Sequence, residues 1–433
     1  MFKYKYKRRF IICRKIEYKK MISYKEAIRK LYKANLSINS EKILSEESLY
    51  RICSENIYSK INYPSANNTA FDGFAISSNE TKKANKNKEI KLKILKTIAA
   101  GDNPNIKKIP RYSCVEVMTG AIIKKPFDTI IPYEKSRVIK IKKNSYLIIS
   151  KKIKKFNNLR FSGSDYKKGQ VVLKKGDLIK PSDILALKTL GIKKINVKKK
   201  IKINFFATGN EITNKEIIPD WKVRNSNGSY IKSFSKILPL EINEKKILRD
   251  KDERKFFNEL KKNISSKTDI IITIGAVSAG KYDFVPRIVK KFNGKGYFKG
   301  SKIRPGKPIL FSKLNSRTAF FGLPGNPVST AACFRFFVLP FIFNSIGYNG
   351  NNPIKAKLKN SFLKKKNFTR FIKGKLTASK NGSLEFEVFK GQESFKIKPL
   401  SNSNAWAQFN SGKSSFKKGD VIDCHTTFGV NFL

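Results

Sequence analysis

Three apolar segments in the second half of the chain each run into a loop of small and polar residues and then into a helical pattern. They are IKINFFATG (201–209), DIIITIGAVSAG (269–280) and RTAFFGLPGN (317–326). Alternation of buried strands and helices is typical of parallel βαβ units. The pattern therefore predicts an α/β domain over 200–347. Ligands of such sheets bind beyond the carboxyl ends of the strands, so we expect these loops to carry the chemistry.

The flanking segments have a different pattern and complete a fold that we predict to be multidomain, α/β plus β. Residues 22–60 are predicted to be helical, with Ser23 and Glu26 as a capping box. Residues 61–150 contain short apolar runs broken by Gly, Pro and Asn, which are typical of short strands. Met21 opens this helical pattern, so the basic stretch before it is either a disordered extension or a wrongly assigned start. The predicted parts are the extension over 1–20, a discontinuous helical and linker domain over 21–60 and 151–199, a β-rich domain over 61–150, the α/β domain over 200–347, and a small C-terminal β-barrel over 348–433.

The charge of the chain is extreme. Lys+Arg 92 against Asp+Glu 32 gives a formal net charge of +60. Such a balance suggests a polyanionic partner, but the lysines are spread along the whole chain among Asn, Ile, Phe and Tyr, which have A/T-rich codons. We favour genome composition over a nucleic-acid role because no RNP-type aromatic motif or basic helix is present. A basic cleft would still attract a small anionic substrate.

The cysteine and histidine content limits which kinds of catalytic and metal sites the chain can form. Five cysteines without a close pair indicate a reducing cytoplasm, and the lone His425 argues against histidine metal sites and Ser-His-Asp triads. An enzyme of this kind must use carboxylates, lysines, hydroxyls and backbone amides. No membrane span is expected: the most apolar helix, 329–346, contains Arg335 and Pro340 and falls short of about 20 clean apolar residues.

Four loops and one turn are candidates for the site. ATGNEI (207–212) and GAVSAGKYDF (275–284) follow two of the strands, and the small residues of the second would turn backbone N–H groups toward a phosphate. GLPGNPVS (322–329) is a rigid turn, and KIRPGKPILF (302–311) sets two cations around a Pro-Gly turn, as an oxyanion clamp or simply as a solvated face. NNTAFDGFAI (67–76) places Asp72 at an Asp-Gly turn, which by itself indicates only a turn beside a strand.

Eight motifs in this order resemble the molybdopterin molybdenumtransferase family, which includes the gephyrin E-domain, from roughly residue 21 to 433. The motifs are NTAFDGFAI, VMTGAIIKKPFDTIIPYE, LRFSGSDYKKGQVVLKKGDLI, ATGNEI, RNSNGSYI, ITIGAVSAGKYDFV, RPGKP and GLPGNPVS. The resemblance implies a transferase that inserts molybdenum from molybdate into adenylylated molybdopterin, releases AMP and completes molybdenum cofactor biosynthesis. It also implies Mg²⁺, which binds carboxylate and phosphate oxygens without histidine.

The resemblance also implies which residues act. The catalytic set is Asp72, Thr119, Asp165, Glu211, Asp250 and Asp283, with Glu211 and Asp283 at the metal. The substrate-binding set is Gly275, Ser278, Gly280, Arg304, Lys307, Pro324, Gly325, Asn326 and Pro327, and Ser401 or Ser403 would be the serine of the barrel.

The chain departs from the family pattern at several motif positions. Asn210 replaces the usual acid beside Glu211, and Ala276 replaces a glycine whose backbone must therefore tolerate a Cβ. The retained acids favour an active enzyme over the two alternatives, which are a molybdopterin-binding scaffold and an adenylyltransferase-like paralogue without metal insertion.

The family pattern also implies a homodimer. Asp72 and Thr119 of one subunit would reach the pocket of the other, and molybdopterin adenylyltransferase and molybdoenzyme chaperones would be partners. Nucleic acid and membrane partners are not expected.

Overall fold

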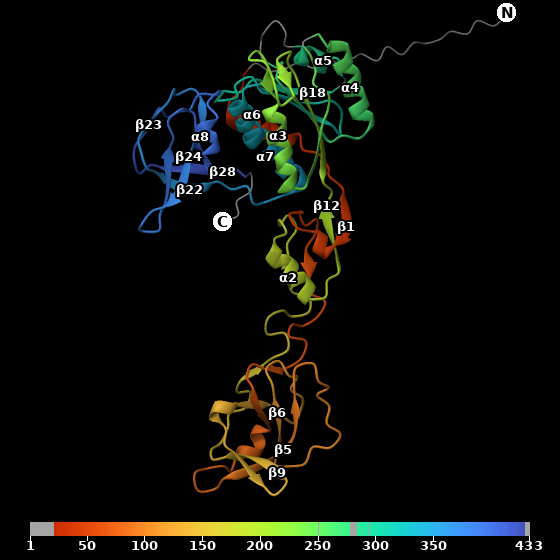
Figure 1. Ribbon diagram of the computed structural model, residues 1–433, viewed down its shortest axis with the longest axis vertical. Coiled ribbons are helices and arrows are strands. Elements are labelled where there is room, and N and C mark those ends of the chain that lie inside the picture. Colours follow the sequence, from red (N-terminus) through yellow and green to blue (C-terminus); the bar gives the residue numbers. More distant parts are fainter. Residues whose placement is uncertain (1–20, 250, 278–283, 293, 429–433) are drawn as a thin grey trace, which may run out of the picture. The chain divides into compact units, whose positions relative to one another are not determined.

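The structure is a computed structural model that describes residues 21–249, 251–277, 284–292 and 294–428. It divides into two compact units (Figure 1). The first unit consists of Met1–Glu55, Lys175–Pro181 and Lys194–Leu433, and the second of Asn56–Lys174 and Ser182–Lys193.

The α/β part of the first unit is built on a six-stranded sheet in the order β16-β13-β17-β21-β20-β18. The first four strands are parallel, and β20 and β18 are antiparallel to their neighbours. The strands are β13 (Ile201–Ala207), β16 (Leu240–Glu244), β17 (Ile270–Ile274), β18 (Lys295–Lys299), β20 (Leu310–Lys313) and β21 (Ala319–Leu323), with the short strands β14 (Ile212–Thr213) and β15 (Val223–Arg224) beside them. The predicted α/β architecture with a mixed sheet is confirmed.

Helices cover both faces of this sheet because its strands are apolar on both sides. Phe205 belongs to the hydrophobic cluster shared with α1, α6 and α7, whereas its neighbour Phe206 packs with residues of α4 and α5. Figure 1 shows α3, α6 and α7 grouped together, apart from α4 and α5. The helical segments are α1 (Tyr24–Lys33), α3 (Ser226–Ser233), η4 (Phe234–Lys236), α4 (Glu253–Ser265), α5 (Val285–Val289), α6 (Pro327–Cys333), the π-helix η5 (Phe334–Val338) and α7 (Leu339–Ile346).

The continuous helix from Pro327 to Ile346 is long and apolar enough to cross a membrane and is the single such helix within the described ranges. In the fold, however, 94% of its most apolar window is buried. Its one arginine, Arg335, is 1% exposed and donates from Nε to the carbonyl of Thr426 at 3.0 Å. The segment is therefore a core helix of the α/β part.

The C-terminal region forms the predicted β-barrel, drawn in blue in Figure 1. Five strands close on themselves in the order β24-β25-β22-β28-β26, and β24 also pairs with β26. β19, from the RPGKP segment, adds to the outside of β24. The elements are β19 (Ile303–Arg304), β22 (Ile354–Leu358), β23 (Phe362–Leu363), β24 (Thr369–Ala378), β25 (Leu384–Val388), α8 (Lys398–Ser401), β26 (Ala405–Phe409), β27 (Ser415–Phe416) and β28 (Val421–Thr426).

The second unit contains a six-stranded sheet in the order β7-β4-β6-β5-β9-β8, with a separate hydrophobic cluster on each face. This is the predicted β-rich part of the fold. Its elements are β2 (Ile57–Tyr58), β3 (Asn68–Thr69), β4 (Gly73–Ile76), η2 (Ser78–Thr81), β5 (Ile90–Ile98), β6 (Ser113–Val117), β7 (Thr129–Pro132), η3 (Tyr133–Lys135), β8 (Val138–Ile141), β9 (Asn144–Ile149), β10 (Leu159–Arg160) and β11 (Val171–Leu173), together with most of α2 (Pro181–Thr189).

The prediction of helix over 22–60 is correct only for α1. Ser23 caps this helix as predicted, accepting from the backbone N–H of Glu26 at 3.2 Å. The chain then forms β1 (Ser40–Leu44) and the 3₁₀ turn η1 (Ser45–Glu47), and β1 pairs with β12 (Lys194–Lys198). This pairing joins segments about 150 residues apart, so no local pattern could indicate it.

Candidate active site

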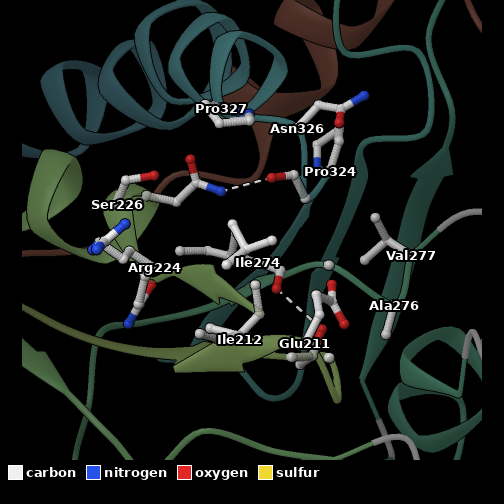
Figure 2. Close-up of a pocket in the computed structure, with 18 of the residues that line it drawn as sticks. Glu211, Ile212, Arg224, Ser226, Ile274, Ala276, Val277, Pro324, Asn326 and Pro327 are labelled. Carbon is white, nitrogen blue, oxygen red and sulfur yellow. Dashed lines mark hydrogen bonds between the residues drawn. The ribbon is translucent and has the colours of Figure 1, made fainter. Parts of the chain in front are cut away.

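A pocket of about 500 Å³ lies at the carboxyl ends of β13, β17 and β21. The three loops that the sequence singled out at these ends all line it. Figure 2 shows Glu211 and Ala276 on one side of the pocket and Pro324, Asn326 and Pro327 on another. The predicted site residues that line it are Glu211, Gly275, Pro324, Gly325, Asn326 and Pro327.

The loop that carries Glu211 is held by one arginine. Nη1 of Arg249 donates to the carbonyl oxygens of Gly209, Asn210 and Ile212 at 3.0, 3.1 and 2.9 Å. Gly209 has φ +139, and a Cβ there would lie 2.5 Å from Oε2 of Glu211. The loop therefore folds the Glu211 carboxylate back over a glycine, and the Glu211 side chain is exposed.

The second loop turns through two residues with positive φ. Gly275 has φ +99, and a Cβ there would lie 2.6 Å from Oγ1 and 2.7 Å from the carbonyl oxygen of Thr208. Ala276 has φ +52, a left-handed conformation that is strained for a residue with a Cβ. The sequence argument that this backbone must tolerate a Cβ is thus confirmed.

The close contact at Gly275 gives a prediction with an internal control. Gly275→Ala should lower the free energy of unfolding by about 2 kcal/mol or more, because the new Cβ meets backbone atoms in an unfavourable conformation. Gly325→Ala, in the facing loop, should change it by less than about 0.5 kcal/mol, because the nearest atom to its Cβ is 3.8 Å away. Tryptophan fluorescence during urea unfolding reports on this unit alone, since both tryptophans, Trp221 and Trp406, lie in it. Equal losses in the two variants would contradict the argument.

Several pocket residues were not selected from the sequence. Arg224 and Ser226 (Figure 2) and Asn227 line the pocket from β15 and the first turn of α3. Nδ2 of Asn227 donates to the carbonyl of Gly325 at 2.7 Å. The RNSNGSYI motif that contains them was noted, but a single sequence does not show which of its polar side chains face a ligand.

A second pocket, of about 650 Å³, lies beside the barrel and is lined by three cationic side chains. Arg304 and Lys307 come from the RPGKP turn, and Arg370 comes from β24. Pro308 lines this pocket and the first one, so the two pockets adjoin. Ser329, Gln392, Ser394 and the Glu393 carboxylate, which forms an ion pair with Lys396, complete the lining.

The pairing of β19 with β24 sets Arg304 directly beside Arg370. Burial, and after it the charge of Arg304, lowers the pKa of Arg370 from its ordinary value. Nε of Arg370 is buried and has no hydrogen-bond partner among the described residues. Like charges placed side by side are unfavourable unless an anion lies between them, so the pocket suits a tetrahedral oxyanion.

Ser394 connects the two pockets. Its Oγ accepts from Nδ2 of Asn326 at 3.2 Å, and its carbonyl accepts from the N–H of Val328 at 3.3 Å. Ser401 and Ser403, the two serines considered from the sequence, do not line either pocket in the described part of the chain. Ser394, which precedes α8, is the serine of the C-terminal region that lines the second pocket, whereas Ser401 ends that helix.

Asp72 and Thr119 lie in the second unit and bind each other. The backbone N–H and the hydroxyl of Thr119 donate to Oδ1 of Asp72 at 2.6 and 2.8 Å, and these bonds hold the pKa of the exposed Asp72 below its ordinary value. The next residue, Gly73, is required because a Cβ there would lie 2.0 Å from the carbonyl oxygen of Ile131. Asp165 is exposed in the same unit. The Asp-Gly pair thus presents a fixed, ionised carboxylate to solvent.

Four predicted site residues, Asp250, Ser278, Gly280 and Asp283, lie outside the described residues. Within the described ranges, no group of three or more His, Cys, Asp or Glu side chains is arranged to hold a metal ion. Of the two predicted metal ligands, Glu211 and Asp283, Glu211 is the one that lies within the described residues, so the fit of a cation is judged on its carboxylate. Its oxygens line a polar pocket and make no hydrogen bond or ion pair with the described residues. One free carboxylate together with substrate phosphates is a donor set that suits Mg²⁺.

Three sequence families match the chain in succession. They are described as the MoeA N-terminal region (domain I and II) over residues 22–191, the probable molybdopterin binding domain over 204–344, and the MoeA C-terminal region (domain IV) over 355–426.

Relatives and solved structures agree with these matches. A molybdopterin molybdenumtransferase of Staphylococcus epidermidis is 30% identical over 421 residues, 96% of this chain and 98% of that protein. One from Staphylococcus aureus is 31% identical over 412 residues, 94% of this chain and 96% of that protein. The crystal structure of the molybdopterin biosynthesis MoeA protein from Pyrococcus horikoshii OT3 has a TM-score of 0.78 at 26% identity and covers 94% of this chain and 100% of that one.

Proposed function

The chain belongs to the molybdopterin molybdenumtransferase family and is a transferase of molybdenum cofactor biosynthesis, and we propose that it inserts molybdenum from molybdate into adenylylated molybdopterin with release of AMP. The observation that carries this reaction is the pair of adjoining pockets. One has the Glu211 carboxylate, exposed in the described part of the chain, and backbone turns suited to a nucleotide-linked pterin, and the other has three cationic side chains suited to an oxyanion.

The first pocket would bind the adenylylated pterin. Its loops direct polar groups and the N-terminus of α6 toward the cavity, and Asn326 and Gly325 fix the turn that closes it. Phosphoanhydride cleavage depends on charge neutralisation and positioning more than on a strong base. Glu211, with Asp283 as the second metal ligand, would hold Mg²⁺, which when bound neutralises charge on the substrate phosphates.

The second pocket would bind molybdate, a tetrahedral dianion. Arg304, Lys307 and Arg370 provide the positive charge, and the hydroxyls of Ser329 and Ser394 provide donors. Because Pro308 lines both cavities, a molybdate here would lie next to the pterin pocket. The arrangement favours transfer between adjacent sites over a scaffold role, which would need the pterin pocket but not the oxyanion pocket.

We further propose that the enzyme is a homodimer in which Asp72 and Thr119 of one copy complete the site around Glu211 of the other. In support, Asp72 and Glu211 belong to different compact units of the chain, and the Thr119 bonds keep Asp72 ionised and exposed. Molybdopterin adenylyltransferase and molybdoenzyme chaperones would exchange substrate and product with it. A cytoplasmic location is supported by Cys114, Cys333 and Cys424, whose thiols are buried and form no disulfide.

The reaction is tested by incubating pure protein with adenylylated molybdopterin, molybdate and Mg²⁺ while AMP and pterin-bound molybdenum are measured. We expect both products to form in equal amounts and only when all three components are present. A related insertase assayed alongside confirms the substrate. AMP formed without molybdenum insertion would show hydrolysis alone and contradict the proposal. Formation of adenylylated molybdopterin from molybdopterin and ATP would instead indicate an adenylyltransferase-like paralogue, and pterin binding without AMP would indicate a scaffold.

A further inference from the structure

Lys373 is a buried lysine in β24 whose ammonium group binds a single loop. Its side chain is 1% exposed, and no carboxylate among the described residues forms an ion pair with it. Instead, Nζ donates to the carbonyl oxygens of Gly391, Glu393 and Lys396 at 3.0, 3.3 and 3.2 Å. An ammonium group has three N–H donors, so the loop formed by Gly391–Lys396 uses all of them.

Gln392 reinforces this connection from the loop side. Its Oε1 accepts from the backbone N–H of Lys373 at 3.0 Å, and its Nε2 donates to the carbonyls of Lys373 and Phe389 at 2.9 and 2.7 Å. The Gly391–Lys396 loop is therefore bound to one residue through both backbone and side chain. Removal of the ammonium would leave the carbonyls of Gly391 and Lys396 without this donor, and the carbonyl of Glu393 with the backbone N–H of Lys396 alone.

The same loop forms one wall of the oxyanion pocket. Gly391 to Phe395 line that pocket opposite Arg304, Lys307 and Arg370, whereas Lys373 does not line it. Ser394, within the loop, accepts from Asn326 and Val328 and so fixes the loop against the neighbouring pocket as well. A change in the loop conformation would move Ser394 relative to the three cations.

We propose that Lys373 is a positioning residue of the oxyanion site, and that its ammonium sets the Gly391–Lys396 loop in the conformation that binds molybdate. The inference rests on the proposed function for the identity of the anion. The affinity of the oxyanion pocket for molybdate would then depend on the protonation of Lys373, whose side chain does not line the pocket.

The pKa of Lys373 is low enough for the proposal to be tested by changing the pH. Burial lowers its pKa from 10.5 to about 8, while nearby Glu393 raises the pKa and Lys396 lowers it. A neutral amine has two N–H donors and a lone pair, so one loop carbonyl loses its partner above this pH. In the unfolded chain the lysine keeps its ordinary pKa. Between about pH 8 and 10.5 the unfolded state therefore binds more protons, and Lys373 makes the fold more stable as pH rises. The titration of Lys373 by itself would therefore not cause unfolding in this range.

The experiment compares Lys373→Met and Lys373→Arg with Lys375→Met. Lys375 lies in the same strand but is exposed, so its replacement removes the same charge without touching the loop. Molybdate binding is measured by calorimetry at pH 7 and pH 9, and hydrogen exchange is measured for the loop peptide. We expect Lys373→Met to weaken molybdate binding about tenfold and to speed loop exchange, and Lys375→Met to do neither. Wild-type affinity should fall from pH 7 to pH 9, whereas that of Lys373→Arg, which does not titrate there, should not.

A folded Lys373→Met protein with wild-type affinity and wild-type loop exchange would overturn the proposal. If that variant does not fold, the comparison of wild type with Lys373→Arg across pH decides, and equal pH profiles overturn it. Hydrogen exchange of the loop needs no anion, so it tests the positioning role of Lys373 separately from the assignment of the pocket to molybdate. Wild-type protein that binds no molybdate would overturn the oxyanion assignment, while the exchange data would still show whether Lys373 holds the loop.

Discussion

The double variant Arg304→Ala/Lys307→Ala is expected to need at least about 100-fold more molybdate than wild type for half-maximal turnover, because a hydrogen bond to a charged group contributes about 1.5–3 kcal/mol and each 1.4 kcal/mol is tenfold. Each single variant should need at least about tenfold more. Turnover at saturating molybdate should fall much less, since these residues are proposed to bind the anion. Initial rates of AMP release across molybdate concentrations measure both effects.

The control for this prediction is Lys302→Ala. Lys302 is exposed and close in sequence, but it does not line the pocket. In a chain with a net charge of +60, removal of any lysine changes the long-range field slightly, and added salt screens that effect. If Lys302→Ala raised the molybdate requirement as much as Lys307→Ala, the anion would be attracted by the general field and the pocket assignment would be wrong.

The sequence predicted those parts of the fold that depend on local pattern. The strands before Gly209, Gly275 and Pro324 were identified because each is a continuous apolar run that ends at a turn residue. The carboxyl ends of parallel strands meet at one edge of a sheet, so the convergence of their loops on one pocket followed. The helix cap at Ser23 was likewise a local signal.

The features that the sequence could not show all depend on pairing between distant segments. Arg370 lies beside Arg304 because β19 adds to β24, and no local pattern indicates that register. Ser394 lines the pocket from a loop that Lys373 and Gln392 bind, and no local pattern pointed to that loop when Ser401 and Ser403 were considered. Thr119 was selected only through family resemblance, and the structure supplies the reason for pairing it with Asp72.

The second large effect concerns the proposed sharing of the site between two copies. Asp72→Ala and Glu211→Gln should each reduce AMP release to below about 1% of wild type while leaving the dimer intact, because each removes a charge from the reacting site. A heterodimer of the two variants, purified through two different tags, should regain about half of wild-type activity. One of its two sites then combines an intact Asp72 with an intact Glu211. Light scattering establishes that each preparation is a dimer.

The reverse arrangement of the same substitutions makes this test decisive. A heterodimer of the doubly substituted chain with wild type carries the same two changes. If the site is shared, one of its two sites then lacks Asp72 and the other lacks Glu211. This heterodimer should be inactive if the site is shared, whereas a site built within one chain would leave the wild-type copy active at about half the dimer rate. The two heterodimers thus give opposite results under the two arrangements, with identical composition and charge. Activity in the second and none in the first would show that Asp72 and Glu211 act within one chain.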